Sequence, residues 1–211
     1  MRASRIFQDR QDAAQQLIAR LQTYRGKHPL ILAIPRGSVP MGKIIAKALQ
    51  GDFDTILVRK LRLPAQPEVA MGSVDESGWT YLLPHASMWG LTPQDVEAEK
   101  KIQLATIQTR RAQYTPIRKP IDPANRIVIV VDDGLATGAT MMAALHSLRQ
   151  HHPAKLVCAI PVASHESLSA VRQLADEVVC LITPENFQAV GQFYRDFRQV
   201  EDDEVIAILA Q

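Results

Sequence analysis

Residues 126–142 constrain this chain more than any other stretch. They open with an unbroken β-branched run, Ile127–Val131, which is typical of a strand covered on both faces in a parallel sheet. Two carboxylates follow, Asp132 and Asp133, and then come a turn of small residues and hydroxyls and a helix-forming run over 141–148. This order predicts a strand, an acidic pair, a tight loop and a helix start in immediate succession.

The turn after the acidic pair is suited to binding a phosphate. A loop of glycine and threonine at a helix N-terminus leaves backbone N–H groups free, and the helix dipole also favours an anion there. The two carboxylates are unsuited to that anion and instead suit sugar hydroxyls or a divalent cation. The stretch therefore predicts a sugar-phosphate site. The alternative interpretation is an ordinary strand-to-helix turn, with a threonine as helix cap and a glycine for the bend.

The rest of the chain alternates between strand and helix patterns. Strands are expected over 30–34, 54–60, 127–131, 155–161 and 178–182, and helices over 9–21, 40–49, 92–114, 164–174 and 202–209. This order predicts a single α/β domain over 1–211, doubly wound around about five parallel strands, with ligands at the carboxyl ends of those strands. Residues 63–123 are expected to form an insertion with an antiparallel hairpin and a long helix, and residues 184–211 a hood-like segment.

Composition narrows the function classes. The 211 residues are 46% hydrophobic and 22% charged, as in a soluble globular protein. The net charge of +2 weighs against a protein that binds nucleic acid through its overall charge. The sequence contains no apolar run near the roughly 18 residues that a membrane span needs. We therefore expect a cytoplasmic protein with no membrane partner.

The segment Val-Val-Asp-Asp-Gly-Leu-Ala-Thr-Gly-Ala-Thr, which ends at Thr140, resembles the phosphoribosyl pyrophosphate (PRPP) motif of type I phosphoribosyltransferases. Every position from Val128 to Thr140 matches that motif: four apolar residues, two acids, three variable residues and Thr-Gly-x-Thr. With its Pro-Arg-Gly and Val-Arg-Lys elements ahead of this motif, the chain is most similar to uncharacterised bacterial members of the family. The resemblance implies a type I fold and a Mg²⁺-dependent transfer of phosphoribose from PRPP to a nitrogenous acceptor such as a nucleobase, with release of pyrophosphate.

The resemblance also implies a role for each residue of the motif. Asp132 and Asp133 would bind the ribose hydroxyls, directly or through Mg²⁺, and one of them would accept a proton from the acceptor. The loop behind them would hold the 5-phosphate through hydroxyl and backbone groups. That loop comprises Gly134, Ala136, Thr137, Gly138, Ala139 and Thr140.

A second loop, over residues 35–38, resembles the pyrophosphate loop of the same family, in which a non-proline cis peptide turns N–H groups toward the leaving group. Taken without the family, it reads as an ordinary strand-to-helix turn. A cation at the end of the next strand would compensate the pyrophosphate charge, and strand alternation favours Lys60 over Arg59 for this role. The loop comprises Pro35, Arg36, Gly37 and Ser38.

The carboxyl-terminal segment resembles the hood that covers the acceptor base. Its aromatic residues Phe187, Phe193 and Tyr194 could stack on a flat heterocycle, although their near-helical spacing is equally typical of a core. The sequence identifies no catalytic lid loop. The long charged helix expected over 92–114 packs on a narrow stripe or leans on a partner subunit, and we expect a homodimer.

Two other functions remain open at this stage. The first is a PRPP-binding regulatory protein that contacts RNA or DNA through basic side chains; a net charge of +2 weighs against it. The second is a phosphate-transferring enzyme with Asp132 as the nucleophile, which predicts a covalent phosphoaspartate. The basic residues of the first alternative are Lys100, Lys101, Arg110, Arg111, Arg118 and Lys119.

Overall fold

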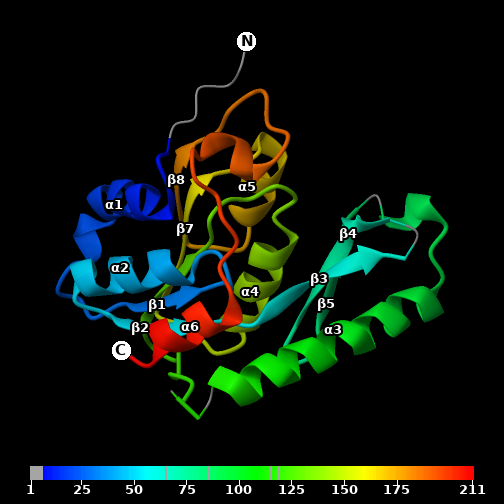
Figure 1. The fold of residues 1–211 in the computed structure, drawn as a ribbon, viewed down its shortest axis with the longest axis horizontal. Helices are drawn as coiled ribbons and strands as arrows, with labels where there is room; N and C mark the ends of the chain where they lie inside the picture. Colours follow the sequence, from blue (N-terminus) through cyan, green and yellow to red (C-terminus); the bar gives the residue numbers. More distant parts are fainter. Residues whose placement is uncertain (1–6, 65, 85, 115, 118) are drawn as a thin grey trace.

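The computed structural model describes residues 7–211 except residues 65, 85, 115 and 118. The chain forms a body around a five-stranded parallel sheet and an arm that projects to one side of it (Figure 1). The strand order in the body is β2-β1-β6-β7-β8, and all four neighbouring pairs are parallel. The body strands are β1 (Leu30–Ala33), β2 (Asp52–Thr55), β6 (Ile127–Val131), β7 (Lys155–Val162) and β8 (Glu177–Ile182).

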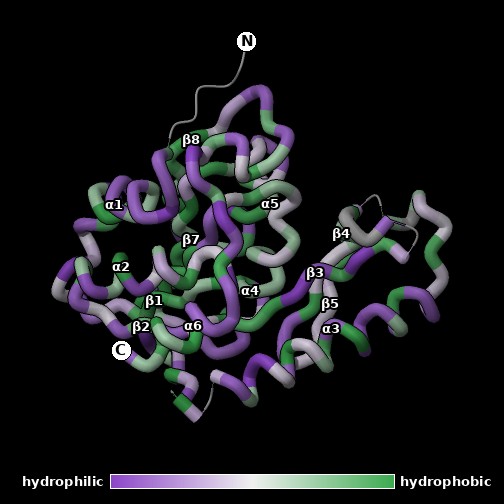
Figure 2. The backbone as a smooth tube through the Cα atoms, in the orientation of Figure 1, coloured by the Kyte–Doolittle hydropathy of each residue, from purple (hydrophilic) through white to green (hydrophobic). Residues whose placement is uncertain are grey.

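Helices cover both faces of this sheet, because successive strand residues point to opposite sides. Ile31 and Ile129 belong to a buried cluster with α1 and α2 on one face, whereas Leu32 and Val130 belong to a second cluster with α4 and α5. The central strands are hydrophobic along their length (Figure 2). This arrangement confirms the predicted doubly wound α/β fold. The covering helices are α1 (Arg10–Arg20), α2 (Val39–Leu49), α4 (Ala139–Arg149) and α5 (His165–Val171).

The arm is a three-stranded antiparallel sheet with a long helix packed along it (Figure 1). Its strand order is β3-β4-β5, and the antiparallel pairing of β4 with β5 confirms the predicted hairpin. The arm joins the body beside α4, where the Ser73 hydroxyl donates to the carbonyl of Ala139 at 2.6 Å. The arm elements are β3 (Val58–Leu63), β4 (Gln66–Asp75), β5 (Thr80–Leu82), a 3₁₀ turn η2 (Ala86–Trp89) and α3 (Pro93–Tyr114).

One predicted strand was wrong. Residues 54–60 do not form a single strand, because β2 ends at Thr55 in the body and β3 begins at Val58 in the arm. The intervening Ile56 and Leu57 are both buried, at 8% and 3% exposure. The hydrophobic pattern therefore runs without interruption across the point where the chain changes sheets, and the insertion begins earlier than residue 63.

The amino-terminal and carboxyl-terminal segments meet above the sheet. The Phe7 N–H donates to the carbonyl of Phe193 at 2.9 Å, and the Arg195 N–H donates to the carbonyl of Phe7 at 2.9 Å. Within the described ranges, no helix has both the length and the hydrophobicity of a membrane span. The remaining elements are the 3₁₀ turns η1 (Gln22–Tyr24) and η3 (Val190–Phe193) and the terminal helix α6 (Asp202–Leu209).

Candidate active site

A cavity of about 680 Å³ lies where the carboxyl ends of β1 and β6 meet the arm and the hood segment. Ligands of open α/β sheets bind at this edge. The cavity brings together residues from both predicted loops, from β3 and from the carboxyl-terminal segment. The predicted residues that line it are Pro35, Arg36, Gly37, Lys60, Asp132, Asp133, Gly134, Ala136, Thr137, Gly138 and Thr140.

The loop after β6 presents backbone donors to this cavity. Gly138 adopts a left-handed conformation (φ +73°) as the residue that precedes α4. Within the described part of the chain, the N–H groups of Ala136, Thr137 and Gly138 make no backbone or side-chain hydrogen bond. Free N–H groups at a helix N-terminus form an anion site. The loop geometry therefore fits the phosphate site that the sequence predicted.

The neighbouring strand and helix hold this loop in place. The Leu135 N–H donates to the Val162 carbonyl at 2.8 Å, and the Ser164 hydroxyl donates to the Ala136 carbonyl at 3.0 Å. Gly134 has no space for a side chain, since a Cβ there would lie 2.6 Å from Val190 and 2.9 Å from Val162. The hood residue Val190 therefore packs directly on the start of the loop.

The acidic pair lies between the two loops. Asp132 Oδ1 accepts a hydrogen bond from the Asp133 N–H at 2.9 Å. Asp133 Oδ2 is held by Arg10 from α1, with Nε at 2.9 Å and Nη2 at 2.8 Å. The Arg10 guanidinium also stacks on the ring of Phe197 at 4.0 Å. Asp133 is therefore an ion-paired carboxylate, whereas Asp132 has no cation in direct contact among the described residues.

The two carboxyl groups have raised pKa values. Burial raises the pKa of Asp132 well above its usual range, and the negative charge of Asp133 raises it further. Burial also raises the pKa of Asp133, and the Arg10 guanidinium opposes that shift. A carboxylate with a raised pKa is a stronger proton acceptor than an exposed one, so this pair is suited to general-base chemistry.

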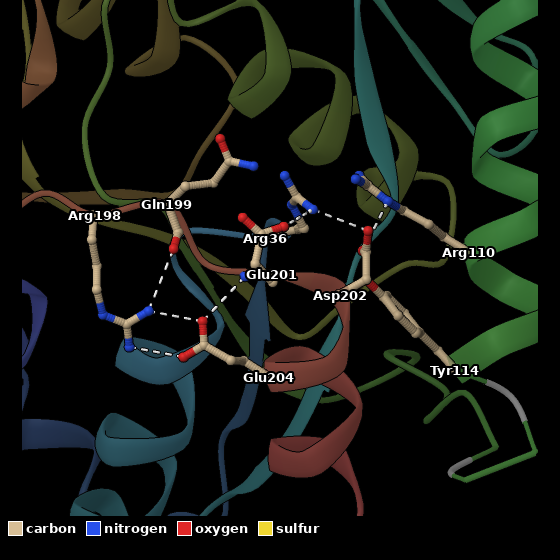
Figure 3. Close-up of polar contacts among 8 residues, drawn as sticks. All are labelled: Arg36, Arg110, Tyr114, Arg198, Gln199, Glu201, Asp202 and Glu204. Carbon is tan, nitrogen blue, oxygen red and sulfur yellow. Dashed lines mark hydrogen bonds and ion pairs between the residues drawn. The ribbon is translucent and has the colours of Figure 1, made fainter.

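The loop after β1 contains a cis peptide bond between Pro35 and Arg36, as the resemblance implied. A Cβ added at Gly37 would overlap Asp133 Oδ2 and lie 3.0 Å from Arg10 Nη2. The absence of a side chain at Gly37 thus lets the two loops approach each other. Arg36 also lines the cavity, and its Nη1 contacts Glu201 at 3.1 Å and Asp202 at 3.0 Å (Figure 3).

A family model for the phosphoribosyl transferase domain matches residues 2–198. This chain belongs to the phosphoribosyltransferase family. A Mycobacterium tuberculosis protein, provisionally named a phosphoribosyl transferase, is 42% identical over 206 residues in each of two strains. The match covers 97% of this chain but only 46% of that protein, so the chain spans about half the length of these curated relatives.

Two solved structures share this fold. The crystal structure of TT1426 from Thermus thermophilus has a TM-score of 0.80 and 38% identity, over 97% of this chain and 98% of that one. A hypothetical protein from Neisseria gonorrhoeae, solved with bound ppGpp, has a TM-score of 0.52 and 13% identity, over 97% of this chain and 94% of that one. The second likeness concerns the fold alone.

The cations of this phosphoribosyltransferase cavity exceed its carboxylates. Arg59, Lys60 and Arg62 of β3 all line it. Strand alternation favoured Lys60 over Arg59 for this role, but both side chains border the cavity. Arg59 Nε donates to Gln103 Oε1 of α3 at 2.9 Å. Burial, together with neighbouring arginines, lowers the pKa of Arg59. Like charges held this close indicate a site built for a polyanion.

Two of the residues predicted in the loops after β1 and β6 do not line the cavity. Ser38 is fully buried and its hydroxyl donates to the Ile34 carbonyl at 2.6 Å. Ala139 is 1% exposed, and its N–H lies 3.4 Å from Thr137 Oγ1. Both residues stabilise the turns that carry the cavity residues, because each begins or precedes a helix whose first turn faces the core.

Two of the three predicted aromatic acceptor residues are buried, and the third, Phe187, does not line the cavity. Phe193 and Tyr194 are 2% and 1% exposed and belong to the core, and Phe187 packs against Phe193 with ring centroids 5.4 Å apart. The Tyr194 hydroxyl donates to the Asp133 carbonyl at 2.7 Å, which fixes the acidic loop from behind. Large aromatic rings are more stable in the core than on a face open to water. Phe197 of the same segment does line the cavity.

Sequence reasoning missed several residues that shape the site. Arg10 is 123 positions from Asp133, and no motif links the two. The hood contributes Gln188, Ala189, Val190 and Gly191, a polar and small-residue wall. Asp202 contacts the pyrophosphate loop through Arg36 and lies beyond the family match. These contacts arise from chain segments that only folding brings together.

The basic side chains of the nucleic-acid alternative are partly committed to ion pairs. Arg110 pairs with Asp202, Arg111 with Glu76, and Lys100 lies 3.9 Å from Glu97. Arg118 lies outside the described residues. Paired cations contribute less to a phosphate-binding surface.

Proposed function

We propose that this chain transfers the phosphoribosyl group of PRPP to a nitrogenous acceptor and releases pyrophosphate. One observation carries the proposal: the loop over 132–140 borders a cavity of about 680 Å³ with free N–H groups at one end and two carboxylates at the other. That arrangement is complementary to a phosphorylated pentose. Membership of the phosphoribosyltransferase family supports the same reaction class. Because the chain spans about half the length of its curated relatives, the activity of the whole protein is also part of this proposal.

Each end of PRPP has complementary groups in the cavity. The 5-phosphate would accept hydrogen bonds from the N–H groups of Ala136, Thr137 and Gly138 and from the hydroxyls of Thr137 and Thr140. The pyrophosphate would meet the backbone of 35–37 and the side chains of Arg59 and Lys60. Seating the anion between these groups would offset the repulsion among the cations of β3.

Magnesium fits the donor set in a specific way. No cluster of three or more His, Cys, Asp or Glu side chains with metal-binding geometry exists among the described residues. Mg²⁺ commonly binds through one or two carboxylates, with the remaining positions taken by water and substrate phosphates. We propose that Asp132 and Asp133 hold the ion together with PRPP. There it would stabilise the negative charge that develops on the departing pyrophosphate.

The chain's own groups would position the reactants and move a proton. Breaking the anomeric bond gives a cation-like sugar, which the carboxylates of Asp132 and Asp133 would stabilise. One of the two carboxylates would accept the proton released by the attacking nitrogen. Gln188 and Phe197 from the hood would contact the acceptor. Closing the arm against the hood would exclude water, which otherwise competes for the sugar.

The test is pyrophosphate release from Mg²⁺-PRPP, measured for one candidate acceptor at a time, beside Asp132→Asn and Thr137→Ala. We expect acceptor-dependent release that both substitutions reduce. Failure of the wild-type chain to bind PRPP would remove the proposal. Binding of PRPP without any release, combined with salt-sensitive binding of RNA or DNA, would favour the regulatory alternative. The homodimer and the cytoplasmic location stay predictions, the first checked by light scattering.

A further inference from the structure

Asp202, the first residue of α6, joins three parts of the molecule (Figure 3). Its Oδ2 contacts Arg36 Nη1 of the pyrophosphate loop at 3.0 Å. Its Oδ1 accepts from the Tyr114 hydroxyl at 3.1 Å and lies 3.3 Å from Arg110 Nε, both on the arm helix α3. One carboxylate thus connects the terminal helix, the arm and the cavity.

The general preference for acidic residues in the first turn of a helix does not account for these contacts. Asp202, Asp203 and Glu204 all lie in the first turn of α6, where acids are favoured by the helix dipole. Asp203 meets that requirement with an exposed side chain. Asp202 instead turns toward Arg36 and Arg110, whose side chains are only 22% and 13% exposed. Ion pairs with largely buried guanidinium groups are screened less than surface pairs.

Asp202 forms a polar link between the arm helix α3 and the body. An open groove of about 360 Å³ lies beside it, and α3 and α6 are therefore not packed tightly along that stretch. Polar links from Asp202 bridge the two helices instead. The groove residues are Ala105, Thr106, Thr109, Arg110, Gln113 and Asp202.

Arg36 is anchored at one nitrogen only. Glu201 and Asp202 both contact Nη1, while Nε and Nη2 of Arg36 have no acceptor among the described residues. Arg36 also lines the cavity. The two carboxylates therefore fix the guanidinium and leave its other donors for an anion, a geometry that suits a bidentate contact with phosphate.

We propose that Asp202 is a positioning residue for the pyrophosphate end of PRPP. It holds Arg36 at the cavity wall and sets the arm helix against the same loop. The inference rests on the proposed function, since PRPP is the ligand whose binding depends on it. Asp202 lies outside the family match over 2–198.

Asp202→Asn is the decisive substitution. Asparagine has one accepting oxygen and one donating nitrogen, so it cannot accept from Arg36 on one side and from Arg110 and Tyr114 on the other. We expect the affinity for Mg²⁺-PRPP, measured by titration calorimetry, to fall about tenfold. Asp203→Asn is the matched control, because it removes the same charge from the same helix turn and should leave the affinity unchanged.

A double-mutant cycle separates positioning from general stabilisation. In an Arg36→Gln background, Asp202→Asn should have little further effect on PRPP affinity, because the residue that it positions is already gone. Additive effects would assign Asp202 a structural role only. Arg110→Gln provides a second variant should Asp202→Asn unfold; although Arg110 does not line the cavity, we expect about a threefold loss of affinity.

The outcomes are distinct. A wild-type chain that fails to bind Mg²⁺-PRPP would overturn the proposed function. A wild-type chain that binds it, with folded Asp202→Asn and Arg110→Gln variants that bind equally well or more tightly, would overturn only the positioning role. Tighter binding would identify the carboxylate as a competitor of the ligand for Arg36.

Discussion

The two loops that border the acidic pair are built differently, although each follows a buried strand of the same sheet. The loop over 134–140 takes its hydrogen bonds from nearby segments, namely its own helix start and the strand and helix that follow it in sequence, while Val190 of the hood packs on Gly134. The loop over 35–38 is held by segments distant in the sequence. Asp133 crowds its glycine, and Glu201 and Asp202 bind its arginine.

This difference shows two ways in which a sequence specifies a site: one loop is shaped by residues close to it in the sequence, and the other by residues that only the tertiary fold brings near. A loop whose donors come from one strand-turn-helix unit keeps its shape wherever that unit folds. A loop shaped by an approach of distant carboxylates depends on the placement of α1, β6 and α6 together. We therefore expect substitutions in the second loop to disturb the fold as well as the ligand, and substitutions in the first to disturb mainly the ligand.

The largest effect is expected for Gly37→Ala. The added Cβ would overlap Asp133 Oδ2 and press on Arg10, and overpacking of this kind costs about 1–3 kcal/mol. Urea denaturation should show that loss, together with loss of PRPP binding. Gly90→Ala is the control: its Cβ would meet nothing within 4 Å, so only its positive φ of +64° opposes the change. Equal costs for both would contradict the close approach of the two loops.

Thr137→Ala should separate ligand binding from folding. Thr137 is exposed and its hydroxyl makes only a 3.4 Å contact with the Ala139 N–H. We expect the PRPP affinity to fall about tenfold, as for a lost hydrogen bond to a charged group, while the free energy of unfolding changes by less than about 0.5 kcal/mol. Calorimetric titration and urea denaturation measure the two quantities. A loss of stability without a loss of affinity would reassign Thr137 to helix capping.

Asp132→Asn should stabilise the protein in a pH-dependent manner. The pKa of Asp132 is raised in the folded state, so the unfolded chain ionises first as the pH increases. The wild type therefore loses stability from about pH 4 upward, through the raised folded pKa. Asparagine cannot ionise and keeps an acceptor for the Asp133 N–H. The stability advantage should be absent near pH 4 and grow toward neutral pH in denaturation series. A constant difference would show that Asp132 titrates normally.

The smallest effect is expected for Tyr194→Phe. The substitution removes one buried hydrogen bond, from the hydroxyl to the Asp133 carbonyl, and should lower the free energy of unfolding by about 1 kcal/mol. Acceptor selectivity should not change, because Tyr194 is 1% exposed and lies in the core. A changed acceptor preference with unchanged stability would restore the stacking role that we first assigned to it.

The sequence predicted the sheet and the phosphate loop because both are encoded in short stretches. Ile127–Val131 has the pattern of a strand covered on both faces, and the glycine and threonines after the acidic pair carry their own turn chemistry. The passage from β2 to β3 was missed because Ile56 and Leu57 are hydrophobic and buried on both sides of the break. The pattern of hydrophobic residues indicates which positions are buried, but it does not indicate to which sheet a buried strand belongs.

By itself the sequence predicted the fold class, the family and the turn over 134–140, since these follow from local pattern and motif. Only the tertiary structure decided which side chains surround that loop. It paired Arg10 with Asp133, buried Tyr194 behind the acidic pair, and brought Asp202 to Arg36. These contacts join residues at least 61 positions apart and leave no periodic trace, because they depend on how whole elements pack rather than on any one of them.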